Sequence, residues 1–255
     1  MPELRATRYV AALREGGSLP AIVETDRGDL MVAKWRGAGQ GAAALVAEVI
    51  AGELARALDL PIPELATLTL DDTLARTERD QEIRDLLVAS VGTNLGMRYL
   101  SGALAFDPAA GTAVAAELAA RVVVFDAFVM NVDRTAKNTN LLWWEGALWL
   151  IDHGAALYWH HGWDGEVERA ARLFPLVRDH VLLPQAASLT APGEAMVSTL
   201  TDEVIESVVA MVPAAWLNAP DVAARRAAYV GFFQQRRDGA AAFLEEAERA
   251  RAACV

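Results

Sequence analysis

The residues best suited to chemistry lie in two short segments near the middle of the chain. The first holds Asp133 and, five residues later, Asn138; the second is the Asp-His-Gly sequence that begins at Asp152. Mg²⁺ prefers hard oxygen ligands and takes few of them from protein, so Asn138 and Asp152 are candidate metal ligands. Asp133 is suited to accept a hydrogen bond from an incoming hydroxyl and to orient it for attack. These residue types at this spacing indicate phosphoryl transfer from Mg·ATP.

Regular elements are predicted on both sides of the first segment. Apolar residues recur at helical spacing through residues 113–130, which predicts an amphipathic helix that ends where the polar loop begins. Two apolar runs, 141–144 and 147–151, are predicted to pair as a hairpin. The predicted order is therefore helix, catalytic loop, hairpin and metal-binding Asp. The alternative is an ordinary turn whose Asn and Asp side chains cap the helix and the hairpin.

A lysine on an upstream strand is the next expected part. Residues 30–35 predict a strand, and its Val-Ala-Lys sequence is similar to the kinase strand whose lysine contacts the α- and β-phosphates. We therefore expect Lys34 to contact ATP. The bend at residues 15–18 contains Gly17 and Ser18, whose backbone N–H groups are candidates to lie over the phosphates. A plain hairpin turn is the alternative for this bend.

A helix predicted over residues 43–58 offers two partners for Lys34. Glu48 lies on a face of small residues that would let the helix approach a sheet closely, whereas Glu53 falls within the apolar stripe. Periodicity alone does not decide between them. Either carboxylate could also be an ordinary solvated helix residue.

Together these segments resemble the HipA-like serine/threonine kinases, relatives in fold of the phosphatidylinositol 3- and 4-kinases. The resemblance rests on four stretches of sequence, which are Asp133-x-x-Ala136-Lys137-Asn138, Leu150-Ile151-Asp152, Lys34, and Ala47-Glu48 followed thirteen residues after Glu48 by Pro61-Ile62-Pro63. The last stretch selects Glu48 over Glu53.

The resemblance implies a role for each of these residues. Asp133 would be the catalytic base or the hydroxyl-orienting residue, and Lys137 would contact the γ-phosphate. Asn138 and Asp152 would hold magnesium, and Lys34 would contact the phosphates of ATP.

The implied fold class is α+β, a two-lobed protein-kinase-like fold. We expect a β-rich N-terminal lobe at residues 1–95 and a mainly helical C-terminal lobe at residues 96–255. A strand is predicted at 86–91, followed by a glycine-containing hinge against which adenine would lie. Helices are predicted for 166–174, 201–211 and 222–250. Four aromatic residues are assigned to the C-terminal core, namely Trp216, Phe232, Phe233 and Phe243.

Composition and net charge limit the classes of partner that the chain can bind. At 255 residues, 54% hydrophobic and 22% charged, the chain suits one globular catalytic unit. The net charge of −11 argues against broad binding to nucleic acid or to anionic membranes. No spanning segment or leader is evident, so we expect a cytoplasmic location. The single Cys254 excludes an intrachain disulfide.

His160, His161 and Asp164 make a poor metal site because adjacent side chains diverge.

The expected function is ATP- and Mg-dependent transfer of the γ-phosphate to a hydroxyl. The resemblance favours protein serine or threonine as the acceptor. Asp133-Arg134 is closer to the lipid-kinase sequence, which leaves a small-molecule or lipid acceptor open. The non-enzymatic alternative is a nucleotide-binding pseudokinase with a regulatory role. This alternative is disfavoured because all four expected residues are present, namely Lys34, Asp133, Asn138 and Asp152.

Overall fold

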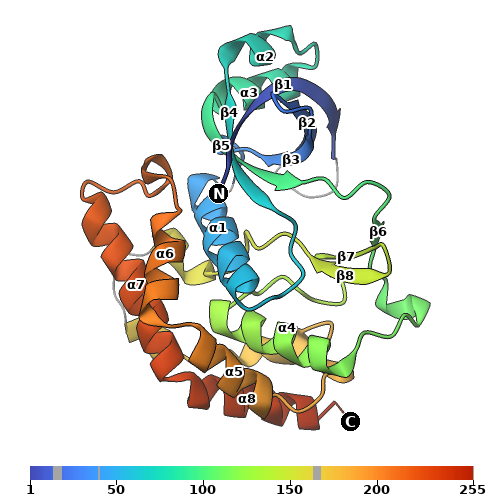
Figure 1. Cartoon of the computed structure of the whole chain (residues 1–255), viewed down its shortest axis with the longest axis vertical. Helices are drawn as coiled ribbons and strands as arrows, with labels where there is room; N and C mark the ends of the chain where they lie inside the picture. Colours follow the sequence, from blue (N-terminus) through green and yellow to red (C-terminus); the bar gives the residue numbers. More distant parts are fainter. Residues whose placement is uncertain (14–18, 40, 163–167, 255) are drawn as a thin grey trace.

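The computed structural model describes residues 1–13, 19–39, 41–162 and 168–254. The chain has mixed α/β structure, with strands concentrated in the N-terminal region and helices in the C-terminal region (Figure 1). The predictions for Gly17, Ser18 and Asp164 lie outside the described residues.

A closed five-stranded barrel forms the N-terminal region. Its spatial order is β1-β2-β3-β5-β4. The strands are β1 (Glu3–Ala12), β2 (Ala21–Thr25), β3 (Leu30–Lys34), β4 (Leu65–Leu70) and β5 (Gly92–Arg98). The barrel closes because β1 pairs in parallel with β4, while the other neighbours are antiparallel. Lys34 therefore ends a strand that is held on both sides, by β2 and by β5.

Two short helices, α2 (Asp72–Thr77) and α3 (Gln81–Ala89), lie beside the barrel (Figure 1). The strand predicted at 86–91 is wrong, because most of that apolar run belongs to α3. The Asp80 carboxylate accepts from the backbone N–H groups of Glu82 and Ile83 and so starts the helix. The neighbouring strand is β5, so the predicted lobe division after residue 95 falls inside a strand.

Helix α1 (Gly41–Ala57) confirms the helix predicted at 43–58. It lies between the barrel and the C-terminal helices (Figure 1), and every residue from Ala44 to Ala55 is buried. Both candidate carboxylates, Glu48 and Glu53, are therefore removed from bulk solvent.

The C-terminal region is built around α4 (Ala116–Val129), which contacts α5 (Thr190–Thr199) and α8 (Ala240–Ala252). Helix α4 and the hairpin of β7 (Leu141–Trp144) and β8 (Ala147–Leu150) confirm the predicted elements of this stretch, but the helix is not amphipathic, because every residue from Val122 to Val129 is buried. The two-residue strand β6 (Leu104–Ala105) adds to the hairpin. The prediction at 201–211 is also confirmed, by α6 (Asp202–Ala210).

Two other helix predictions need correction. Of the stretch 166–174, the described part contains only a 3-10 turn at Glu168–Ala171. The long helix predicted at 222–250 is two helices, α7 (Val222–Asp238) and α8, separated at Gly239. The four aromatic residues assigned to the core are all buried. Within the described ranges, no helix combines the length and hydropathy needed to cross a bilayer.

A buried arginine fixes the end of α4, directly before the polar loop. The guanidinium of Arg236 on α7 donates to the carbonyls of Ala127 at 2.8 Å and Phe128 at 3.2 Å. A cation at a helix C-terminus satisfies carbonyls that have no partner within the helix. The loop that follows α4 therefore starts from a fixed point.

Candidate active site

One lysine lies between two carboxylates where the two regions meet. The ammonium of Lys34 on β3 contacts Glu48 of α1, and it donates to Asp152 Oδ1 at 2.9 Å. The side chain of Lys34 is 12% exposed, whereas that of Asp152 is 53% exposed. The cluster therefore joins three distant parts of the sequence and is open to solvent on the side of Asp152.

Charge and burial set the ionisation of this cluster. Burial alone would lower the pKa of Lys34, but the charges of Glu48 and Asp152 outweigh it and the pKa is raised. Burial opposes ionisation of Asp152 as well, but the charge of Lys34 outweighs it and lowers the pKa of that carboxyl. Burial, with Asp152 nearby, raises the pKa of Glu48 to about 7. At neutral pH the exposed Asp152 is therefore a carboxylate, and Lys34 is charged.

The second candidate carboxylate has a different partner. Glu53 Oε2 lies 3.2 Å from Arg56 Nε, and Arg56 also donates to the carbonyl of Pro63 at 3.1 Å. The structure thus brings Lys34 together with Glu48, as the family register predicts, and leaves Glu53 in a local pair within α1.

Asp133 is held in place by three asparagines. Its backbone N–H donates to Asn131 Oδ1 at 3.2 Å, and its Oδ2 accepts from Asn138 Nδ2 at 2.7 Å and from Asn140 Nδ2 at 3.3 Å. Asp133 is half-buried, and Asn138 is exposed. The carboxylate therefore has a fixed orientation in a loop that remains open on one side. Lys137 is exposed, and its ammonium makes no ion pair with any described residue.

Beneath this loop lies a buried ionic network centred on Asp126 of α4. Its carboxylate accepts from Arg134 Nε at 2.5 Å, His180 Nε2 at 2.9 Å and Asn131 Nδ2 at 3.0 Å. Burial would raise the pKa of Asp126, but the charge of Arg134 and the bond from His180 outweigh it, so the pKa is lowered. A buried charge without such partners would be strongly destabilising, so these groups depend on one another.

Arg134 also joins the loop of Asp133 to the segment that carries Asp152. Its guanidinium contacts the carbonyl of Asn140 and lies 3.1 Å from His153 Nε2. Because arginine only donates, His153 accepts at Nε2 and carries its proton on Nδ1, which lies 4.0 Å from Glu48 Oε2. Burial, together with the charge of Arg134, lowers the pKa of His153 to about 3, so this ring is neutral. The network thus connects the Asp133 loop to the Lys34 cluster.

Sequence reasoning did not find this network. One signal was present, because an acidic residue between the apolar residues of a helix is seldom buried unless it is paired, and Asp126 stands between Phe125 and Ala127. His180 is 54 residues away from its partner Asp126, so no local pattern could indicate that contact.

The donor types in the site suit magnesium. Among the described residues, no group of three or more His, Cys, Asp or Glu side chains could hold a metal ion. Mg²⁺ is usually held by one or two protein carboxylates together with substrate phosphates and water. The ionised Asp152 and the exposed Asn138 provide such hard oxygen atoms, one from each half of the site. His160, which was considered for a metal site, instead lies 3.0 Å from the hydroxyl of Tyr229.

Comparison with known proteins gave one family match and a structural match. The sequence model of one protein family, described as HipA-like kinase, matches residues 7–230 of the chain. A solved structure similar to this one is the Helicobacter pylori proinflammatory kinase CtkA, with a TM-score of 0.56 and 10% sequence identity over 99% of both chains. No curated protein matches the sequence significantly. At this identity the structural likeness shows a shared fold.

Proposed function

The chain belongs to the HipA-like kinase family and is therefore a phosphotransferase, and we propose that it transfers the γ-phosphate of ATP, with magnesium, to a serine or threonine hydroxyl of a protein. The observation that carries this proposal is the ammonium of Lys34 between Glu48 and Asp152. A fixed cation beside an ionised, exposed carboxylate suits a nucleotide phosphate and its metal ion.

We propose that the strand-rich and helical regions are the two lobes of a kinase. The proposed division lies after Arg98, where β5 ends, slightly later than the sequence predicts. ATP would lie between the lobes. Lys34 would contact the α- and β-phosphates, and Glu48 would hold Lys34 in place. We also propose that Gly17 and Ser18 contact ATP.

Asn138 and Asp152 would hold the magnesium ion, which neutralises charge on the phosphates when it is bound. Asp133 would accept the proton of the acceptor hydroxyl. The oxygen of that hydroxyl would attack the γ-phosphorus as ADP leaves. Lys137, which is exposed beside Asn138, would contact the γ-phosphate. The three asparagine bonds to Asp133 support its role because they fix the direction of its carboxylate.

The Asp133-Arg134 sequence is a weak argument for a lipid acceptor. Arg134 is 1% exposed and is bonded to Asp126, so its guanidinium is not available to an acceptor headgroup. Family membership therefore makes a protein hydroxyl the first choice, and a small-molecule or lipid hydroxyl the second.

Incubation with labelled ATP tests which class of molecule accepts the phosphate. Purified protein should be incubated with γ-labelled ATP and Mg²⁺, alone and with cell extract, and the products separated into protein, lipid and small-molecule fractions. We expect the label on protein, and phosphoamino-acid analysis should recover phosphoserine or phosphothreonine. Label confined to lipid or to a small molecule would contradict a protein acceptor.

The two helix carboxylates give a further prediction. Glu48→Gln should lower phosphotransfer by about 10-fold or more, because the neutral amide does not supply the carboxylate charge that holds Lys34 in place. Glu53→Gln should leave the rate nearly unchanged, since Glu53 pairs with the partly exposed Arg56. Initial rates at saturating Mg·ATP, on variants shown by circular dichroism to be folded, decide between them. The reverse order of effects would show that Glu53 is the functional residue.

A further inference from the structure

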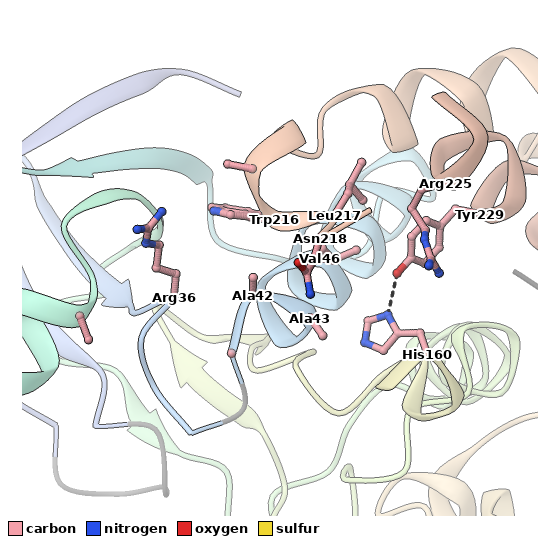
Figure 2. Close-up of a pocket in the computed structure, with 13 residues that line it drawn as sticks. Arg36, Ala42, Ala43, Val46, His160, Trp216, Leu217, Asn218, Arg225 and Tyr229 are labelled. Atoms are coloured by element: carbon pink, nitrogen blue, oxygen red, sulfur yellow. Dashed lines mark hydrogen bonds between the residues drawn. The ribbon is translucent and has the colours of Figure 1, made fainter. Parts of the chain in front are cut away.

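A second cavity, of 550 Å³, lies at the N-terminal end of α1. Its walls come from both regions of the protein: the first turns of α1 and Arg36 on one side, and the loop before α7 together with α7 itself on the other (Figure 2). Its volume is in the range of small-molecule sites. None of the proposed catalytic or metal-binding residues is among its described lining residues. It therefore presents different functional side chains from the Lys34 cluster, although the pocket at that cluster shares Gly41 with it.

The cavity has a charge opposite to that of the whole chain. Arg36 and Arg225 both line it, and no described lining residue is acidic, although the net charge of the protein is −11. The guanidinium of Arg36 makes no ion pair with any described residue. Positive charge along a cavity of an acidic protein favours an anionic ligand.

Further polar groups lie beside the two arginines. The amide of Asn218 and the hydroxyl of Tyr229 line the same cavity (Figure 2). Burial raises the pKa of Tyr229 to about 12, so its hydroxyl stays protonated and lies 3.0 Å from His160 Nδ1. Gly41, Ala42 and Ala43 also line the cavity, at the start of a 17-residue helix whose first turn has no acidic residue. Backbone N–H groups at a helix N-terminus favour anions.

The walls are fixed by hydrogen bonds. The backbone N–H of Arg36 donates to the buried Asn94 at 2.9 Å, and that of Gly37 donates to Ser90 Oγ at 3.2 Å. A Cβ atom at Gly37 would lie 2.8 Å from the backbone of Ala89, so this segment packs closely and is not a loose connector. On the opposite wall, Trp216 Nε1 donates to the carbonyl of Thr93 at 2.9 Å. The backbone segments on both sides of the cavity are therefore held in fixed positions.

We propose that this cavity binds a phosphate-bearing ligand, either a free phosphate compound or a phosphorylated side chain. Guanidinium groups match phosphate oxygens in a bidentate manner, which lysine or a neutral donor does not reproduce. Arg36 and Arg225 lie toward opposite ends of the cavity, with Ala42 and Val46 between them (Figure 2). The ligand is accordingly elongated, with an anionic group at one end or both and an apolar middle.

Occupancy of this cavity would affect the nucleotide site, a step that rests on the proposed function. The ligand contacts the first turns of α1, and α1 also carries Glu48, which pairs with Lys34. A ligand that contacts both α1 and α7 should stabilise the position of α1 in which Glu48 is paired with Lys34. Phosphate and Mg·ATP should then strengthen the binding of one another by the same factor.

Calorimetry in phosphate-free buffer at low salt tests the site itself, with inorganic phosphate and a phosphothreonine peptide as probes and the unphosphorylated peptide as control. We expect both phosphate probes to bind the wild type. The Arg36→Gln, Arg225→Gln double variant should weaken binding by about 10-fold or more, and the two single variants show which end of the cavity holds the phosphate. The matched control is Arg76→Gln on α2, whose side chain is 77% exposed, and it should bind like the wild type.

Lys34→Met separates this cavity from the proposed ATP site, because phosphate could also bind at Lys34. Binding that survives in Lys34→Met and is lost in the Arg36→Gln, Arg225→Gln double variant supports the cavity. Binding that is absent in the wild type, lost in Lys34→Met, or retained in the double variant overturns it. Arginine-dependent phosphate binding in a protein that fails to bind Mg·ATP would support the cavity while contradicting the proposed kinase function.

Discussion

Asp133→Asn should lower the rate of phosphotransfer by about 10²-fold or more while leaving the affinity for Mg·ATP nearly unchanged. The expected loss is the scale of a positioned acid–base group. The amide has almost the same shape as the carboxylate and can still accept from Asn138 and Asn140, but it cannot take the proton of the acceptor hydroxyl. No contact joins Asp133 to the Lys34 cluster among the described residues, and the bond that Asp133 accepts from the proposed magnesium ligand Asn138 is kept, so nucleotide binding should be preserved.

The measurement is kcat together with the ATP dissociation constant on the same preparations. Asp179→Asn is the matched control, because Asp179 is an exposed carboxylate of the same region and should leave both quantities as they are in the wild type. A wild type that binds Mg·ATP without turnover on any acceptor, and an Asp133→Asn variant that behaves identically, would favour the pseudokinase alternative.

Asp126→Asn should lower the free energy of unfolding by about 3–5 kcal/mol, because it leaves the guanidinium of Arg134 buried without its carboxylate. His180 and Asn131 would lose a charged acceptor at the same time. Urea denaturation at pH 7 measures this difference. Because Arg134 also contacts His153, we expect the rate of phosphotransfer to fall in Asp126→Asn even under conditions in which this variant is folded.

Asp202→Asn is the control for this stability prediction. Asp202 lies 2.7 Å from Arg237, but its side chain is 54% exposed, and such pairs contribute less than about 1 kcal/mol. A loss of similar size in both variants would contradict a special role for the buried network.

The stability difference should also depend on pH. The folded-state pKa of Asp126 is lowered, so its contribution is present above the unfolded pKa of about 3.9 and is lost as the pH falls toward the folded value. The gap in stability between wild type and Asp126→Asn should therefore shrink on acidification below about pH 4. A gap that stays constant there would show that the carboxylate charge of Asp126 is not the stabilising group.

Length and clear end signals explain which elements could be predicted from the sequence. Helices α1 and α4 are long, and the hairpin of β7 and β8 is bounded by a clear turn, so each was predicted close to its observed limits. The contact of Lys34 with Glu48 required the family register, because both Glu48 and Glu53 are buried on α1 and periodicity does not distinguish them.

Local ambiguity explains the wrong predictions. A short apolar run such as 86–91 fits a strand or a helix equally, and the Asp80 cap decides for the helix. Helix α5 was not predicted because Pro192-Gly193 is typical of a turn. Proline is tolerated in the first turn of a helix, and a Cβ at Gly193 would lie 2.6 Å from Leu244 of α8, so close helix packing explains that glycine.

Long-range contacts explain why the rest of the site could not be predicted. The catalytic candidates lie in short motifs, but the groups that fix them come from distant segments. Arg134 contacts Asp126 on α4 and His153 after β8, and His180 reaches Asp126 from a later turn. Such pairings depend on the folded arrangement of α4 against its neighbours, which no single stretch of sequence contains.

Binding of ATP with and without Mg²⁺ tests the central claim most directly, measured by calorimetry on the wild type and on Asp152→Asn. The account predicts that the wild type binds ATP more tightly when Mg²⁺ is present, and that Asp152→Asn loses most of this magnesium-dependent gain, because the ionised Asp152 carboxylate is the proposed ligand. Absence of ATP binding to the wild type in either condition, or a magnesium-dependent gain that is unchanged in Asp152→Asn, would contradict it.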